Sequence, residues 1–273
     1  MISNKKKYEL YRPKKFLGQN FLTDDNIARK IVFSLDITPD DTIIEIGPGL
    51  GILTKHLIEL SVNFHAVEID KGIFEKLTLQ YGEKINLIHR DFLKLDFEKD
   101  IQSANRSIKI IGNIPYNITT EILFKLFETS NKVETAVLMM QREVARRLTA
   151  EPDTKNYGIL AIQTQLNTTP KILFNVPPSA FFPKPNVVST VVRFDFKPEN
   201  EKLINRKLFK ELVRESFGQR RKTMKNSLSK FCDRNDLITG KINFDFKRRP
   251  ENVSIDEFID LANEIEIQLT KNV

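Results

Sequence analysis

The sequence contains no tryptophan, a single cysteine and only three histidines among its 273 residues. The one cysteine, Cys232, excludes an intrachain disulfide framework and any cysteine-rich metal site. The histidines, His56, His65 and His89, are not spaced like the ligands of a zinc ion. We therefore expect a protein that works without a bound metal.

Long apolar runs are also lacking. No stretch approaches the roughly 20 apolar residues that a helix needs to cross a bilayer. The lysine-rich N-terminus has no apolar segment behind it, so no secretory signal is predicted. A hydrophobic content of 40% beside 29% charged residues argues against a disordered chain. These features predict a globular, cytoplasmic protein without membrane contact, and we expect a monomer.

Positive charge is present in excess, with a net charge of +7, and it is concentrated in two segments. Residues 1–15 carry a net +5 and residues 201–249 a net +9, so the remainder of the chain is acidic. The later segment is rich in arginine, whose planar guanidinium group suits phosphate. This favours contact with nucleic acid over a merely solvated surface. The residues expected to make that contact are Arg220, Arg221, Lys222, Arg248 and Arg249.

Short apolar runs of strand type alternate with helical patterns along most of the chain. The strand-like runs lie at 42–46, 64–69, 85–89, 108–111 and 135–140. Helical patterns lie at 53–60, 73–81 and 118–127, after a first helix that begins near Thr23. This alternation predicts an α/β fold with a mainly parallel sheet and right-handed crossovers. A late run at 189–196 predicts one antiparallel strand.

A change of composition near residue 198 divides the chain. Lys197-Pro198-Glu199-Asn200 has the composition of a linker, and the residues beyond it follow a helical pattern. Ser254, with Glu257 three positions later, forms a capping-box pattern before the last helix. We expect a basic arm and loop at 1–22, an α/β domain at 23–198 and a small basic helical domain at 199–273.

Glycines and two acids follow the first three predicted strands. The turn from Glu45 to Gly51 has the spacing G-x-G-x-G, and Pro48 removes an amide that a phosphate could have used. Glu68 ends the second strand, where a carboxylate can receive two ribose hydroxyls. Asp91 ends the third, where it can accept from an adenine amino group. Together they indicate an adenosine-bearing ligand without pyrophosphate, and S-adenosylmethionine (SAM) fits.

The fourth strand ends in Asn113-Ile114-Pro115-Tyr116. The Asn113 carboxamide and a backbone carbonyl held by Pro115 can accept hydrogen bonds from a planar exocyclic amine, while the ring of Tyr116 lies against a base. Two such acceptors would pull the amine toward tetrahedral geometry and aim its lone pair at a methyl group. The tetrapeptide therefore predicts methyl transfer to an adenine amino group.

Six blocks of sequence resemble the ribosomal RNA adenine dimethyltransferases, specifically those of the small ribosomal subunit. The blocks are Leu17–Leu22, Glu45–Gly51, Asn113–Ile118, Met140–Ala145, Val176–Pro185 and Phe217–Thr223. The resemblance implies a Rossmann-like SAM-dependent methyltransferase domain followed by a small helical RNA-binding domain. The cofactor residues expected from the glycine turn and from the resemblance together are Asn20, Leu22, Gly47, Gly49, Glu68, Asp91 and Asn113. Phe181 matches the family aromatic that stacks on the target adenine opposite Tyr116, and Phe182 occupies the same turn.

The resemblance implies dimethylation of the N6 atoms of two adjacent adenosines near the 3′ end of small-subunit (16S) rRNA, with a role in ribosome biogenesis. The nearest alternative is an Erm-type large-subunit rRNA methyltransferase, which shares the core blocks. A second alternative is a ribosome-assembly factor that binds RNA and keeps residual activity. The intact Asn113–Tyr116 run argues against loss of activity, and the net charge of the helical domain argues against a small-molecule methyltransferase.

Overall fold

The computed structural model describes residues 11–60, 63–101, 107–129 and 131–271. The chain divides into two compact units. We call the part up to Ala145 together with Asn167–Pro198 the sheet unit, and Arg146–Leu166 together with the residues from Glu199 onward the helical unit. The second boundary falls at the linker that the sequence indicates. Residues 146–166 differ from the expected division, because they pack with the late helices instead of the sheet.

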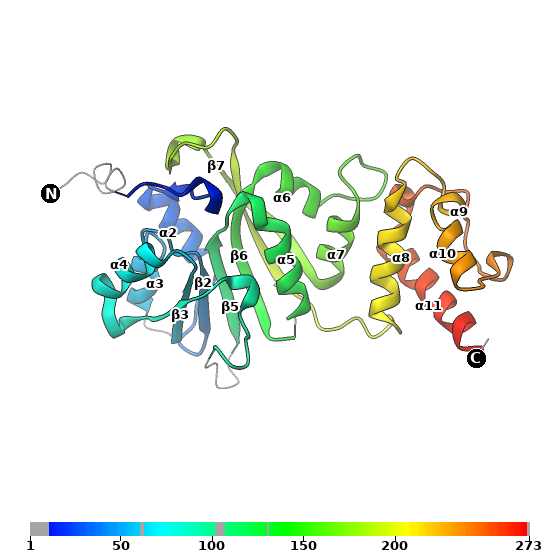
Figure 1. Ribbon diagram of the computed structural model, residues 1–273, viewed down its shortest axis with the longest axis horizontal. Coiled ribbons are helices and arrows are strands. Elements are labelled where there is room, and N and C mark those ends of the chain that lie inside the picture. Colours follow the sequence, from blue (N-terminus) through cyan, green and yellow to red (C-terminus); the bar gives the residue numbers. More distant parts are fainter. Residues whose placement is uncertain (1–10, 61–62, 102–106, 130, 272–273) are drawn as a thin grey trace. The chain divides into compact units, whose positions relative to one another are not determined.

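The sheet unit is built on a seven-stranded sheet in the order β4-β3-β2-β5-β6-β9-β7 (Figure 1). Its parallel strands are β2 (Thr42–Ile46), β3 (Asn63–Glu68), β4 (Asn86–His89), β5 (Ile108–Asn113) and β6 (Val133–Gln141). The strand β9 (Ser189–Phe196) runs antiparallel to β6, as expected from the sequence. The predicted mainly parallel α/β class is thus confirmed.

Three strands were not predicted. The edge strand β7 (Thr168–Val176) pairs antiparallel with β9 and has an irregular register between Ile172 and Phe174. It contains a proline and exposes residues on both faces, so it lacks an alternating apolar pattern. The two-residue strands β1 (Phe21–Leu22) and β8 (Phe181–Phe182) pair with each other and are too short for any periodicity.

The helices of the sheet unit are α2 (Asp25–Phe33), α3 (Thr54–Leu57), α4 (Lys71–Tyr81) and α5 (Thr119–Glu128). The helix α6 (Arg142–Leu148) directly follows β6 and spans the first boundary between the units. The helix α2 begins where the sequence predicts. Its N-cap Asp24 accepts hydrogen bonds from the amides of Asn26 and Ile27, both at 3.0 Å.

Side chains along each strand point alternately to the two faces of the sheet, and this determines which polar side chains share a face at the carboxyl ends of the strands. Ile43, Phe64 and Ile111 share one buried cluster with residues of α2 and α3, so they point to the same face of the sheet. Since side chains alternate with a period of two residues, the positions two or four residues further along point the same way. At the carboxyl ends of the strands those positions are Glu45 on β2, Glu68 on β3 and Asn113 on β5.

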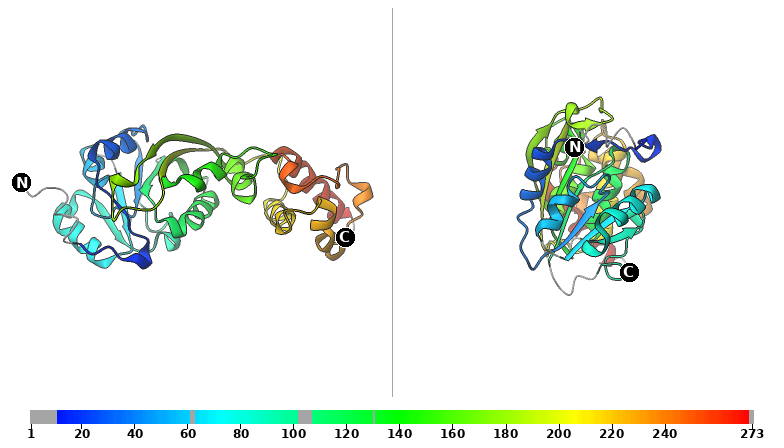
Figure 2. Two further views of the ribbon diagram at one scale, coloured as in Figure 1. Left: turned by 90° about the horizontal axis from the view of Figure 1, so that it is seen from above. Right: turned by 90° about the vertical axis from the view of Figure 1, so that its left-hand side faces the viewer.

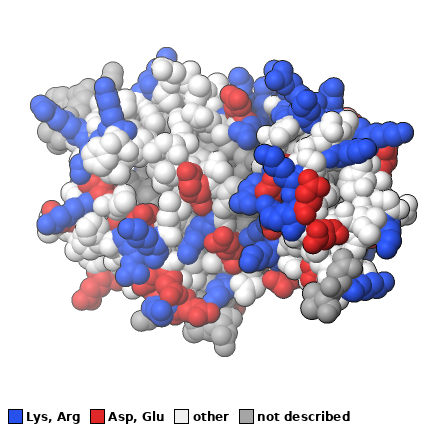
Figure 3. Space-filling view, turned by 45° about the vertical axis from the view of Figure 1, so that its right-hand side comes forward, with Lys and Arg blue, Asp and Glu red and all other residues white. Residues whose placement is uncertain are grey.

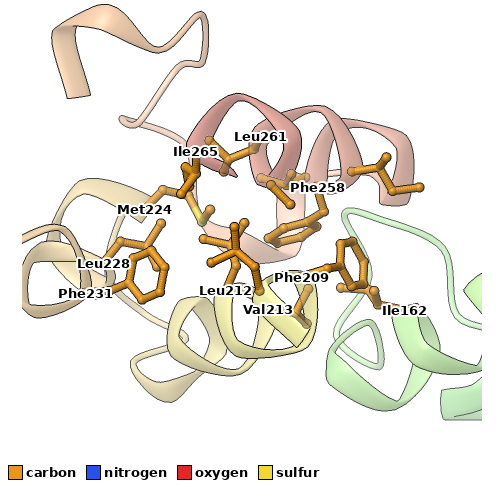
Figure 4. Packing of buried hydrophobic residues seen from close by; sticks show 14 of the residues in the cluster. Ile162, Phe209, Leu212, Val213, Met224, Leu228, Phe231, Phe258, Leu261 and Ile265 are labelled. Atoms are coloured by element: carbon orange, nitrogen blue, oxygen red, sulfur yellow. The ribbon is translucent and has the colours of Figure 1, made fainter. Parts of the chain in front are cut away.

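The helical unit has its own apolar core. It comprises α7 (Ile159–Asn167, of which Asn167 belongs to the sheet unit), α8 (Arg206–Gly218), α9 (Met224–Ser227), α10 (Ser229–Arg234) and α11 (Ile255–Lys271). Figure 4 shows side chains from α8, α9, α10 and α11 converging, with Phe209 and Phe258 among them. The predicted capping box is present: the Ser254 amide donates to Glu257 Oε2 at 2.8 Å, and the Glu257 amide donates to Ser254 Oγ at 3.3 Å.

Candidate active site

A cavity of about 240 Å³ lies at the carboxyl ends of the central strands. Its walls come from the ends of β2, β3 and β5, from the turns that follow them and from Arg90–Leu93 after β4. Residues Phe16–Leu22 also line the cavity, as do Ile73 of α4 and Ile122 of α5. The strand order runs from β2 outward to β4 and then returns to β5 on the other side of β2. In open α/β sheets, such a reversal is the place where ligands bind.

The turn after β2 leaves room for a ligand beside its backbone. Gly47 has a φ of +62°, and a Cβ built on it would meet no other atom within 4 Å. Gly49 has a φ of +54°, and an added Cβ would lie 3.0 Å from the ring of Phe21. These positive φ values disfavour side chains. The glycines thus keep the wall open at Gly47 and allow Phe21 to close on the turn at Gly49.

Glu68 is almost completely buried, with 4% of its surface exposed. Its Oε1 accepts from the Asp70 amide at 2.8 Å, and its Oε2 accepts from the Gly49 amide at 3.3 Å. Burial raises the pKa of this carboxyl group. A buried acid that lines a cavity with lone pairs remaining suits donors from a ligand, such as the hydroxyls of a ribose.

Asp91 follows β4 and lines the same cavity. Its Oδ1 accepts from the Leu93 amide at 2.9 Å and so caps the short 3-10 helix at Phe92–Lys94. Capping and ligand binding are compatible here, because a carboxylate has a second oxygen.

The orientation of the Asn113 carboxamide is set by the chain segment opposite. Its Nδ2 donates to the backbone carbonyl of Asn20 at 2.8 Å. A carbonyl can only accept, so the NH₂ side must face it and Oδ1 must be the remaining acceptor. The side chain of Asn20 donates to the Gly18 carbonyl at 3.2 Å. Asn20 and Asn113 both line the cavity.

Tyr116 lies on the turn after β5 and also lines the cavity. Its hydroxyl is 2.6 Å from Oγ of Ser189, which is fully buried at the start of β9. Burial raises the pKa of Tyr116. Sequence reasoning missed Ser189, because the residue stands 73 positions away from Tyr116 and belongs to no recognisable motif.

The structure does not bring Phe181 to the cavity. Phe181 is 5% exposed and belongs to the buried cluster that also holds Leu22 and Val176. Phe182 is half-buried and packs beside Phe21 and the residues of α4. Neither Phe181 nor Phe182 is among the residues that line the cavity. Leu22, in contrast, is a core residue and a lining residue at once.

Two further acids at the site were not predicted. Glu45 is 1% exposed, lines the cavity and accepts from Thr54 Oγ1 at 2.7 Å. Burial, with a smaller contribution from the nearby Glu68 charge, raises its pKa to about 8, so it is mostly protonated at neutral pH. Asp70 does not line the cavity, but its carboxylate accepts hydrogen bonds from Tyr11, Lys14 and Gln19. In both cases the signal was an acid at or just after a strand end.

The five arginines and lysines expected to contact nucleic acid belong to the helical unit, and they differ in their surroundings. Arg220 pairs with Glu251 at 3.0 Å and donates to the Lys155 carbonyl at 2.6 Å. Arg248 pairs with Glu257 through both of its terminal nitrogens and also donates to a backbone carbonyl. The exposed side chains are Arg221, Lys222 and Arg249. Lys and Arg side chains, with acidic ones among them, cover much of the face seen in Figure 3.

Two kinds of feature are absent from the part of the chain that the structure describes. No group of three His, Cys, Asp or Glu side chains there is placed to hold a metal ion. Among the same residues, no helix combines the length and the apolar character needed to span a bilayer.

Comparison with known proteins identifies the family. The family model described as ribosomal RNA adenine dimethylase matches residues 11–266. The ribosomal RNA small subunit methyltransferase A of Francisella tularensis subsp. novicida (strain U112) is 40% identical over 255 residues, which cover 92% of this chain and 97% of that protein.

Two solved structures are also similar. A dimethyladenosine transferase from Plasmodium falciparum has a TM-score of 0.74 at 27% identity, over 91% of this chain and 98% of that chain. The 23S rRNA methyltransferase ErmE has a TM-score of 0.65 at 22% identity, over 90% and 99%, which shows a shared fold. From the family match and the identity to curated relatives, we conclude that the chain belongs to the ribosomal RNA adenine dimethylase family, an SAM-dependent group of methyltransferases.

Proposed function

We propose that this protein transfers methyl groups from SAM to the N6 atoms of two adjacent adenosines near the 3′ end of small-subunit rRNA, two to each, during ribosome biogenesis. The observation that carries the proposal is the hydrogen bond from Asn113 Nδ2 to the Asn20 carbonyl. It leaves one oriented acceptor, Oδ1, in a cavity that also contains a buried acid suited to ribose. The 40% identity to small-subunit relatives supports this branch over the Erm type.

The residues of the cavity fit the cofactor. Glu68 is desolvated and has lone pairs left for ribose hydroxyls, and Asp91 has a second oxygen for the adenine amino group. The open space beside Gly47 admits a ligand against the backbone. We infer that Asn20, Leu22 and Gly49 complete this binding site together with Asn113.

When bound, SAM supplies an electrophilic methyl group on a positively charged sulfur. Asn113 Oδ1 accepts one N–H of the target amine. The carbonyl of Pro115 already accepts from the Ile118 amide and from Thr119 Oγ1, so we infer that the second acceptor is the carbonyl of Ile114, whose position the proline ring fixes. The hydrogen bonds to both acceptors become stronger as the nitrogen gains positive charge, and this lowers the free-energy barrier to methyl transfer.

Each methyl transfer forms one bond, breaks one bond and releases one proton. The nitrogen lone pair forms the new N–C bond, the carbon–sulfur bonding pair leaves with the sulfur, and the nitrogen then releases one proton to water. The monomethylated amine retains one N–H for Asn113, so the same site serves the second transfer. The ring of Tyr116, held by Ser189, supports the base, and stacking by Phe181 would require movement out of its buried cluster.

We propose that the helical unit holds the RNA backbone through the exposed Arg221, Lys222 and Arg249, while Arg220 and Arg248 stabilise the unit itself. Loop nucleotides leave their stack at the lowest free-energy cost and are therefore the natural targets of such a pocket. This substrate would place the protein in the cytoplasm, and we expect it to act as a monomer.

The experiment that tests the proposal maps N6,N6-dimethyladenosine after purified protein and labelled SAM are mixed with small ribosomal subunits that lack the modification. We expect label at two adjacent adenosines near the 3′ end, and much less label after the same short reaction time with Asn113→Ala. Label in large subunits alone would favour the Erm-type activity. Tight binding to small subunits without any label would favour an assembly factor.

A further inference from the structure

The segment Tyr11–Leu22, which we call the strap, forms one wall of the cofactor cavity. Seven consecutive residues of it, Phe16–Leu22, line the cavity. The strap is drawn in dark blue in Figures 1 and 2. Its regular structure consists of one short 3-10 helix, Lys15–Leu17, and the two-residue strand β1. Such a segment contains too few internal hydrogen bonds to hold its own shape, so contacts with the rest of the sheet unit must fix it.

Those contacts converge on one carboxylate. Asp70 is 2% exposed and precedes α4. Its Oδ2 accepts from the Tyr11 hydroxyl at 2.5 Å and from Gln19 Nε2 at 2.9 Å, and its Oδ1 accepts from Lys14 Nζ at 2.8 Å. Burial alone would raise the pKa of Asp70, but the hydrogen bonds from Lys14, Tyr11 and Gln19 lower it to about 2. Three donors from one strap therefore meet a single buried charge, which also caps α4 through the Gly72 amide at 3.0 Å.

The same strap reaches the two groups that the proposed function uses. Its Asn20 carbonyl accepts from Asn113 Nδ2 and thereby fixes the carboxamide. Asp70, which the strap binds through Tyr11, Lys14 and Gln19, donates from its own amide to Glu68 Oε1 at 2.8 Å. The strap also packs closely against the turn after β5, since a Cβ added to Gly18 would lie 2.5 Å from Asn117 Oδ1. Asp70 thus connects Glu68, the proposed ribose acceptor, with Asn113: its amide binds Glu68, and its side chain binds the strap, whose Asn20 carbonyl binds Asn113.

We propose that Asp70 is a positioning residue that latches the strap across the cofactor cavity and, through the strap, orients the Asn113 carboxamide. The proposal rests on the proposed function for the identity of the ligand, whereas the latch itself can be tested without any ligand. Asp70, Tyr11 and Lys14 do not line the cavity, so a change at these three residues does not remove a group that faces the ligand.

Two sets of variants break the latch from opposite sides. Asp70→Asn keeps the size of the side chain and the ability to cap α4, but it removes the charge and turns one acceptor into a donor. Tyr11→Phe with Lys14→Met removes two strap donors and leaves Asp70 intact. The matched control is Asp41→Asn, since Asp41 is also buried (3% exposed) and forms an ion pair with Lys109 Nζ at 3.0 Å, but it precedes β2 at the opposite end of the sheet.

The first measurement is amide hydrogen exchange over residues 15–22 in the ligand-free protein. The second is calorimetric binding of S-adenosylhomocysteine. We expect faster exchange and roughly tenfold weaker binding in both sets of latch variants, but not in Asp41→Asn. Because both sets act through one contact, their combination should weaken binding little more than either alone. At saturating SAM, Asp70→Asn should also slow single-turnover methyl transfer.

Unchanged exchange and unchanged binding in Asp70→Asn would overturn the latch, as would equal effects in Asp41→Asn or fully additive effects of the two sets. If the unaltered chain does not bind S-adenosylhomocysteine, the cofactor assignment in the proposed function fails. The exchange measurement then still decides whether Asp70 holds the strap.

Discussion

At the scale of single residues, the site is a set of buried and half-buried acids and amides, several of which are held by hydrogen bonds with backbone groups. Burial has two opposing effects on Glu68. It removes water from the carboxylate that is proposed to bind the ligand, and it raises the pKa of that carboxylate. Such a group destabilises the ligand-free protein at neutral pH and is compensated when donors arrive.

We therefore expect Glu68→Gln to bind S-adenosylhomocysteine one to two decades more weakly, because charge-assisted hydrogen bonds contribute about 1.5–3 kcal/mol. The same variant should be more stable than the parent without ligand, since the neutral amide carries no charge into the interior. Calorimetry and thermal unfolding measure both effects. An unchanged dissociation constant in the folded variant would remove Glu68 from the cofactor site.

His65 is a second residue whose burial has a measurable consequence. It is 3% exposed on β3, and neither ring nitrogen has a hydrogen-bond partner. Burial lowers its pKa below the ordinary 6.5, so the unfolded chain binds this proton more readily than the folded one.

Stability should accordingly fall as the pH drops below about 6.5 through the unfolded-state pKa of His65. His65→Leu, which replaces the ring by an apolar side chain, should remove this part of the pH dependence. Urea unfolding between pH 5 and 8 measures it. A slope that is identical in parent and variant would show that His65 is solvated or partnered.

Sequence reasoning could propose Glu68, Asp91 and Asn113, which line the cavity, because each stands at or just after the end of a recognisable strand. It could not find Asp70 or Ser189 as site residues, since their partners Gln19 and Tyr116 are 51 and 73 positions away. The roles given to Arg220 and Arg248 changed for the same reason. Their acidic partners become visible only when the chain is folded.

At the scale of elements, the central strands and the edge strand β4 were predictable, whereas the other edge strand, β7, was not. The strands β2, β3, β5 and β6 are mostly buried and largely apolar, as expected where both faces of a parallel sheet are covered. The strand β7 forms an edge with exposed residues and an irregular register, so its composition resembles that of a loop. Helix starts were predictable where a side chain caps them, as at Asp24 and Ser254.

The capping box of α11 provides the prediction at this scale. Ser254→Ala removes the hydroxyl that accepts from the Glu257 amide, and it should destabilise the helical unit by about 1 kcal/mol. Thr270→Ala, in the exposed last turn of the same helix, is the control and should change stability by less than about 0.5 kcal/mol. Urea unfolding followed by circular dichroism compares them, and equal stabilities would mean that the cap contributes nothing.

At the scale of the whole molecule, the sheet unit contains the cavity, and the helical unit contains the exposed Arg221, Lys222 and Arg249. If RNA contact depends on Arg221, Lys222 and Arg249, replacing all three by Ala should weaken binding to small-subunit rRNA. The slope of log affinity against log salt should become shallower by about two, because fewer counterions are released. Binding measured at several salt concentrations tests this, with Glu199→Gln as a charge-changing control.

The affinity for S-adenosylhomocysteine should not change in the triple variant, because its three positions do not line the cavity. In contrast, Arg220→Ala should lower the stability of the helical unit through the loss of its pairing with Glu251. A triple variant with the parent's salt dependence would return these side chains to an ordinary solvated surface.

The most direct test of the central claim is single-turnover methyl transfer to small subunits by Asn113→Ala, with RNA and cofactor binding measured separately. The acceptor at Asn113 strengthens as the amine becomes positive, so its loss should slow transfer by about two to three decades, far more than it weakens the binding of RNA or of the cofactor. Asn113→Asp, which keeps an acceptor oxygen, should retain more activity than Asn113→Ala. Transfer by Asn113→Ala at close to the parental rate would contradict the account and leave Asn113 as a turn residue.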